Sequence, residues 1–285
     1  MRCDLHVHTT HSGMCTVPVL RRICRESYSD PLEVYDTLKR RGMHLVTITD
    51  HDSIDAAESL RRYPDFFLSE EVSGVMPSGT RFHMGVYDIE ERDHTELQRR
   101  RTDFHALVAY LRERQLLFSI NHAFSCLTGS RSDHDFVLFE RYVPAMETRN
   151  GQMPASSNQS AAEFARRLGK AEVGGSDAHT TFSLGSTYTE VRGARDRGEF
   201  LWGLRHARGI VHGESGRFSK LTRAVLEIAC CSIRERLWRL SLMPLLLAVP
   251  LVTLINVGQE RAFARYWARR LRCVAASPGW RAEAA

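Results

Sequence analysis

Two histidines at alternate positions of an apolar segment open the chain, in Asp4-Leu5-His6-Val7-His8. The alternation of Leu5 and Val7 with the imidazoles is typical of a β-strand, where positions i and i+2 point to the same side. His6 and His8 would therefore project side by side and could together bind a divalent metal ion. Because two imidazoles do not complete a coordination shell, we expect the rest of the chain to bring further ligands to this strand.

Segments with the patterns of strands and helices alternate along residues 1–213. Such alternation is typical of a parallel α/β fold, in which active sites gather at the carboxyl ends of the strands. Most candidate ligands follow an expected strand, which places them at one end of the fold. The expected strands are 44–49, 66–68, 81–89, 116–120, 142–148, 186–191 and 210–211, and the expected helices are 30–42, 53–62, 91–115, 158–168 and 197–207.

The candidate ligands are mostly imidazoles with a minority of carboxylates. This mixture suits Zn, Mn or Fe rather than Mg or Ca. The pair Asp177 and His179 repeats the i, i+2 spacing of the first strand, and a carboxylate such as Glu71 could bridge two ions. The candidates are His6, His8, His51, Glu71, His83, His122, Asp177 and His179.

The order of these motifs resembles the PHP superfamily, the polymerase and histidinol phosphatase proteins. The resemblance covers about residues 1–213 and implies a distorted (β/α)7 barrel with a two- or three-metal phosphoesterase site, followed by a helical C-terminal extension. The motifs that carry it are Asp4-Leu5-His6-Val7-His8-Thr9, Thr49-Asp50-His51-Asp52, Glu71-Val72-Ser73, Phe82-His83-Met84-Gly85, Asn121-His122-Ala123 and Gly175-Ser176-Asp177-Ala178-His179.

The resemblance also implies how the ligands divide among the ions. A third ion would use two histidines and a ligand from the loop after the first strand. The first ion would take His6, His8, Glu71 and Asp177, the second would share Glu71 and use His83 and His122, and the third would use His51 and His179.

The loop after the first strand departs from the family pattern. Many relatives have Asp or His at the ligand position, whereas this loop offers Gly13, Met14 and Cys15. Aligned without a gap, Cys15 takes the ligand position, and its thiolate could bind zinc. The alternatives are that Cys15 is an ordinary buried cysteine and that His11 is the loop donor or a substrate contact.

The expected activity is metal-dependent hydrolysis of a phosphate ester, with metal-bound hydroxide as the nucleophile. The substrate would be a small phosphorylated metabolite or a nucleotide. Asp177 or a ligand histidine such as His179 would handle the proton. Arg149 could clamp a phosphate, although it could also be a solvated loop arginine. Asp4 and Asp50 are expected to orient imidazoles or to cap strand ends.

The charge distribution weighs against a long nucleic-acid track. The chain has a net charge of +5, of which residues 214–285 carry +7 and residues 1–213 carry −2. Because a track along phosphates needs clustered Lys and Arg, an exonuclease-like activity is the alternative, and a catalytically silent scaffold tethered at the membrane is another. Seven cysteines without a CxxC pair, and no signal peptide before the first strand, predict a cytoplasmic location.

Residues 214–285 are expected to form a separate basic, partly apolar helical tail. Residues 221–240 have the pattern of a basic amphipathic helix. The following 240–257 are 18 residues without a charge, interrupted by Pro244 and Pro250, whereas a spanning helix needs about 20 apolar residues. We expect helices that pack on the barrel or on a second subunit, with a peripheral membrane contact through the flanking arginines as the alternative.

Overall fold

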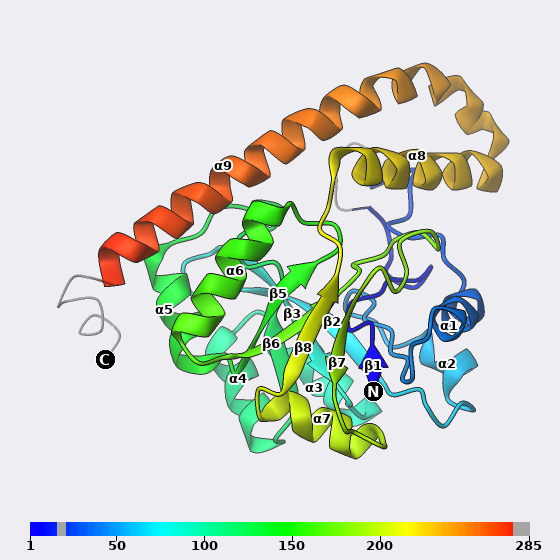
Figure 1. The fold of residues 1–285 in the computed structure, drawn as a ribbon. Helices are drawn as coiled ribbons and strands as arrows, with labels where there is room; N and C mark the ends of the chain where they lie inside the picture. The colour runs from blue at the N-terminus through cyan, green and yellow to red at the C-terminus, as the bar shows by residue number, and fades with distance from the viewer. Residues whose placement is uncertain (16–20, 276–285) are drawn as a thin grey trace.

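The computed structural model describes residues 1–15 and 21–275, and its strands form two sheets (Figure 1). The first is antiparallel and joins the two ends of the 1–213 region. The three-stranded sheet has the order β1 (Arg2–Cys3), β7 (Thr187–Val191), β8 (Gly209–Gly213), and the five-stranded sheet has the order β2 (Ser69–Val75), β3 (Arg81–Tyr87), β4 (Leu117–Ile120), β5 (Ala145–Asn150), β6 (Ala171–Gly175).

Regular strand pairing does not close these sheets into the expected barrel. Two extended segments, 4–9 and 44–51, lie between the sheets and pair only through isolated bridges such as Val7 with Ala178 and His51 with Glu71. Side chains replace backbone partners there: Thr49 Oγ1 accepts from Val7 N at 2.9 Å. Because polar side chains occupy the ladder positions, these segments stay extended without forming regular strands.

The pairing is also less parallel than expected. Among the regular strand pairs of the described residues, only β4–β5 and β5–β6 are parallel, whereas β2 pairs antiparallel with β3 and β3 with β4. For β2 and β3 the reason is the short turn after β2, in which Met76 N donates to Thr80 O at 2.7 Å. A turn of this length joins antiparallel strands, since a parallel pair needs a crossover of a dozen residues or more.

The helices match several expected ranges and correct others. Asp30 caps the first helix by accepting from Leu32 N and Glu33 N. The expected helix 91–115 is two helices, because the Asp103 side chain caps a new start. The fifth helix was not expected. The helices are α1 (Pro31–Arg40), α2 (Ala57–Leu60), α3 (Glu91–Arg100), α4 (Phe104–Glu113), α5 (Asp133–Tyr142), α6 (Ala155–Arg167) and α7 (Arg197–Arg205).

The tail forms an arch that leaves the body and returns to it (Figure 1). It consists of α8 (Phe218–Glu235), a 3-10 helix (Leu237–Ala248) and α9 (Val249–Ala275). The stretch Leu237–Cys273 is the one described helical segment long and apolar enough to cross a membrane. The two halves of the arch differ in how they pack on the body.

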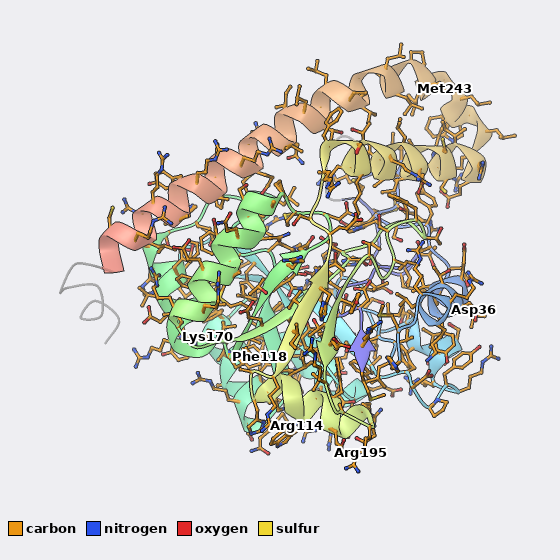
Figure 2. The ribbon with its side chains drawn as sticks, in the orientation of Figure 1. Asp36, Arg114, Phe118, Lys170, Arg195 and Met243 are labelled. Atoms are coloured by element: carbon orange, nitrogen blue, oxygen red, sulfur yellow. The ribbon has the colours of Figure 1, made fainter. Side chains whose placement is uncertain are left out.

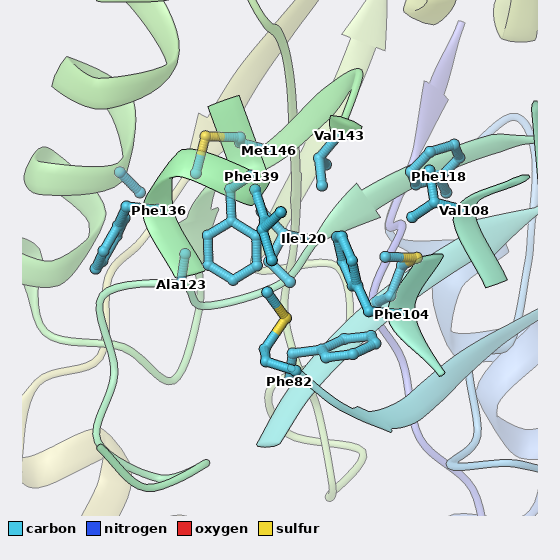
Figure 3. Close-up of a cluster of buried hydrophobic side chains, with 14 of the residues drawn as sticks. Phe82, Phe104, Val108, Phe118, Ile120, Ala123, Phe136, Phe139, Val143 and Met146 are labelled. Atoms are coloured by element: carbon cyan, nitrogen blue, oxygen red, sulfur yellow. The ribbon is translucent and has the colours of Figure 1, made fainter. Parts of the chain in front are cut away.

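The second half of α9 belongs to the main hydrophobic core. That core lies between the five-stranded sheet and α4, α5 and α6, and Figure 3 shows part of it around Phe82, Phe104 and Phe139. Trp267 of α9 joins it, with its ring centroid 4.9 Å from that of Phe136. Packing on the body is thus observed for this half of the arch.

We predict that Trp267→Ala lowers the free energy of unfolding by about 3–5 kcal/mol, because a buried indole is removed from a close-packed core. Urea denaturation would measure the loss. Trp202→Ala on α7 is the control, since Trp202 is 46% exposed and should cost less than about 1 kcal/mol. Equal losses for the two variants would show that α9 does not contribute to the core.

Candidate metal centre

The eight candidate ligands lie together in one buried cluster. They come from the segment after β1, the bridge at His51, the β2–β3 hairpin and the loops after β4 and β6. The groups of ligand atoms that lie within 4.8 Å of one another are His6–His8–Asp177, His6–Glu71–His122, His51–Glu71–His83 and His8–His51–His179. Because each group shares members with another, the cluster is continuous.

Glu71 lies at the centre of the cluster. Its Oε1 is 3.3 Å from His6 Nε2 and 3.4 Å from His122 Nε2. Its Oε2 is 3.2 Å from His51 Nδ1 and 3.5 Å from His8 Nε2. Burial alone would raise the pKa of Glu71, but the surrounding histidines hold that pKa well below its usual value. The carboxylate is therefore ionised and faces imidazoles with both oxygens.

Several buried polar atoms of the cluster lack a hydrogen-bond partner in the described part of the chain, as is expected of atoms that bind a metal ion. His6 Nε2, His8 Nε2, His51 Nδ1 and Glu71 Oε2 are buried and make no hydrogen bond with any described residue. Leaving buried polar atoms without partners is costly. A divalent transition ion accepts imidazole nitrogens and carboxylate oxygens as ligands, so this donor set fits such ions.

The orientation of His8 is fixed by a chain of hydrogen bonds. Ser12 Oγ donates to Asp50 Oδ1 at 2.6 Å and accepts from His8 Nδ1 at 2.9 Å. The proton on Nδ1 leaves Nε2 directed at the cluster, as in metal sites where an outer carboxylate orients a histidine. Asp50 acts through Ser12, and Asp4 instead accepts backbone hydrogen bonds from Ser176 and Gly185.

Glu147 and Asn150 are site residues that sequence reasoning missed. Glu147 Oε1 accepts from His6 Nδ1 at 2.7 Å, and Oε2 accepts from His122 N at 2.9 Å. Asn150 Nδ2 donates to Glu147 Oε2 and to Asp177 Oδ2, both at 3.0 Å. Three ligands are thereby tied to β5.

A β-bulge in β5 brings Asn150, and not Arg149, to the side of Glu147. The register of β5 shifts between Glu147 and Arg149, so the simple alternation of sides breaks there. Asn150 consequently shares a side with Glu147. Arg149, the expected phosphate clamp, instead donates from Nη1 to Gly213 O on β8 at 2.7 Å.

Glu26 occupies the place that the sequence suggested for Cys15. The loop folds back on itself, with Glu26 N donating to Gly13 O at 3.1 Å. Glu26 Oε2 then lies 3.6 Å from His51 Nε2, and Oε1 lies 3.8 Å from His179 Nε2. No close group of ligand atoms in the described part of the chain includes Cys15. The signal in the sequence is that Glu26 is the one acidic residue of the basic segment 21–28.

The backbone is strained at two ligands. His122 has φ 30° and Asp177 has φ 51°, values that L-residues seldom adopt and that cluster at functional sites. Gly175 precedes this strained turn, and a Cβ there would lie 2.3 Å from His6 N. Only glycine allows the end of β6 to approach the first strand so closely.

We predict that the metal affinity of the cluster rises with pH. Burial would lower the pKa of His179, but the nearby carboxylates of Glu26 and Asp177 raise that pKa to about 9. A coordinating imidazole must lose this proton, so the affinity should increase about tenfold per pH unit for each proton released, until the pH exceeds that pKa.

Competition against a metal-binding dye from about pH 6 to 8 would measure this dependence, and calorimetry in buffers of different ionisation enthalpy would count the protons. A constant affinity across that range would contradict the prediction.

Comparison with known proteins is consistent with these observations. A family model described as PHP-associated matches residues 155–208, which include Asp177 and His179. An uncharacterized protein of Methanocaldococcus jannaschii is 31% identical over 74 residues, which is 26% of this chain and 42% of that protein. The chain thus spans less than half of the length of this curated relative.

Two solved structures align with most of this chain. PsfC from Pseudomonas syringae PB-5123 matches 81% of this chain and 97% of its own, with 18% identity and a TM-score of 0.57. A lesion-specific endonuclease from Pyrococcus furiosus matches 72% of this chain and 56% of its own, with 16% identity and a TM-score of 0.48. The match to PsfC shows a shared fold alone. With the order of the motifs, the family match confirms that the chain resembles the PHP superfamily.

Proposed function

We propose that the protein is a metal-dependent phosphoesterase that hydrolyses the phosphate ester of a small metabolite or nucleotide. The observation that carries the proposal is the central position of Glu71, whose two oxygens each face imidazoles from different segments. This arrangement suits a carboxylate shared by two ions. When bound, such ions lower the pKa of a coordinated water and stabilise the charge of a phosphoryl group.

Some residues of the cluster would bind the ions, and others orient those ligands. One ion would be held by His6, His8 and Asp177 together with Glu71. Glu71 would also hold a second ion with His83 and His122, whose Nδ1 and Nε2 lie 3.7 Å and 3.4 Å from Glu71 Oε1. Glu147, Asn150 and the Ser12–Asp50 pair keep these ligands oriented. Asn121 supports the centre directly, since its Nδ2 donates to Glu71 Oε1 at 2.8 Å.

The roles of His179 and Glu26 depend on whether the protein binds two ions or three. With two ions, His179 would bind no metal and would donate a proton to the leaving oxygen, because its side chain is partly exposed and Glu26 faces its Nε2. With three ions, His51, His179 and Glu26 bind the third. Asp177 orients His179 in both cases, since its backbone carbonyl lies 2.9 Å from His179 Nδ1.

We expect the wild-type protein to hold two or three transition ions and to release phosphate from p-nitrophenyl phosphate in a chelator-sensitive way. Glu71→Gln should reduce the metal content and lower kcat/KM by at least about 100-fold, because the shared ligand loses its charge. Elemental analysis and the release of nitrophenol measure the two effects.

Glu70→Gln is the matched control. Glu70 is a buried neighbour on the same strand but accepts from His94 and Gln98 on the other face. Its substitution should leave metal content and activity close to wild type. The proposal fails if wild type and Glu71→Gln hold equally little metal. Cleavage of a labelled oligonucleotide with little activity on small esters would assign the site to nucleic acid instead.

Two substitutions test whether Cys15 or Glu26 completes the site of a third ion. Cys15→Ser should leave the metal content unchanged, because Glu26 already faces His51 and His179. Glu26→Gln should remove one ion from a three-ion protein. In a two-ion protein it should shift the basic limb of the kcat profile to lower pH, because a neighbour that raises the pKa of His179 is lost. A loss of metal in Cys15→Ser alone would return the ligand role to Cys15.

A further inference from the structure

The outer part of the arch exposes an unusual amount of apolar surface. Leu247 is 87% exposed, and Met243 lies near the far end of the arch (Figure 2). Contiguous apolar patches of this kind mark interaction sites on soluble proteins. The large apolar side chains of residues 237–257 that are at least 50% exposed are Leu237, Trp238, Leu240, Met243, Leu245, Leu247, Leu251, Val252, Leu254 and Ile255.

Both ends of the arch are attached to the same body. At the start of α8, Lys220 Nζ donates to Ser186 Oγ at 2.9 Å. In α9, the buried Glu260 accepts from Ser125 Oγ and from Cys126 N, each at 3.1 Å. The apolar segment 237–257 therefore leaves and re-enters the body on one side, so it can enter one leaflet of a membrane but cannot cross it while its flanks stay docked.

Positive charge flanks the apolar segment on both sides. Arg234, Arg236 and Arg261 are exposed, and none has an acidic partner in the described part of the chain. Residues 240–257 between them carry no charge. This pattern, an apolar surface bordered by arginines, is complementary to anionic headgroups above an acyl layer. A second copy would bring the same arginines together, because a symmetric interface pairs identical patches.

The arch also contacts the loops that carry the metal cluster. Glu235 of α8 pairs with Arg25 at 3.0 Å, next to Glu26. Glu260 holds the turn at residues 125–126, whose Ser125 N donates to His122 O. A surface bound by the arch would therefore lie on the side of the molecule where these loops are.

We propose that residues 237–257 insert into the headgroup–acyl boundary of a membrane containing anionic lipids, and that this contact holds the metal centre at the membrane surface. The insertion is monotopic, since both flanks are docked on the body. The arginines contact lipid phosphates, and the apolar side chains lie below them. This membrane partner is independent of whether the centre hydrolyses a phosphate ester.

Flotation of the full-length protein with vesicles tests the proposal. Vesicles of phosphatidylcholine with about 30% phosphatidylserine should bind the protein, and vesicles of phosphatidylcholine alone should bind it more weakly, with binding reduced by salt. The double substitution Leu247→Glu/Leu251→Glu should lower the partition coefficient at least about tenfold, because two charges replace exposed apolar side chains. Arg234→Ala and Arg236→Ala should each weaken binding about fivefold.

Trp202→Glu is the matched control, since Trp202 is an exposed apolar side chain on α7, at the opposite end of the body (Figure 1). It should float like wild type. Circular dichroism and hydrolysis of a soluble ester, unchanged in Leu247→Glu/Leu251→Glu, would exclude misfolding as the cause of lost binding.

Three outcomes would overturn the proposal. One is equal flotation of wild type and Leu247→Glu/Leu251→Glu, and another is no flotation of either. The last is a stable dimer in sedimentation that the double substitution dissociates without any vesicle binding, which would make the apolar segment an interface between two copies.

Discussion

The charge balance around one buried carboxylate determines the arrangement of the metal centre. Glu71 is 1% exposed, and an isolated ion at such a position would be strongly disfavoured. His6 and His122, whose pKa values the neighbouring carboxylates raise despite burial, supply compensating positive charge when no metal is bound. A divalent ion can supply that charge when these imidazoles lose their protons. The same geometry therefore serves a protonated cluster and a metal-loaded one.

The network around the ligands accounts for the irregular part of the sheet. Thr49 and Asp50 accept hydrogen bonds from the backbone of the first segment at positions where a regular strand would pair. Asp50 also holds Ser12, which orients His8. The residues that interrupt the strand ladder are thus the residues that position a ligand, so an unbroken barrel would lack this support.

The tail links the periphery of the molecule to the centre through polar contacts. Glu260 is buried in α9 and holds the turn after His122, while the apolar segment of the arch projects away from the body. The tail is therefore more than an appendage: one half completes the core through Trp267, and the other half offers a surface. Removal of the arch would take away the hydrogen bonds of Glu260 that hold the turn after His122.

The sequence by itself determined which eight side chains gather in the cluster and the order of most elements, because spacing i, i+2 and apolar runs are local properties of the chain. It also located the segment that holds Glu147 and Asn150, but strict alternation could not reveal a bulge, which depends on the neighbouring strand. Glu26 was hidden for a similar reason, since it joins His51 and His179 only after its loop folds back.

Only the tertiary structure decided the open sheets and the divided behaviour of the tail. Each depends on contacts between residues far apart in the chain, such as Trp267 with Phe136. A local pattern shows which side chains are apolar, but it cannot show which of them find a partner. That is why the composition of 237–257 left both packing and membrane contact open, and why the exposure of Leu247 favours the second.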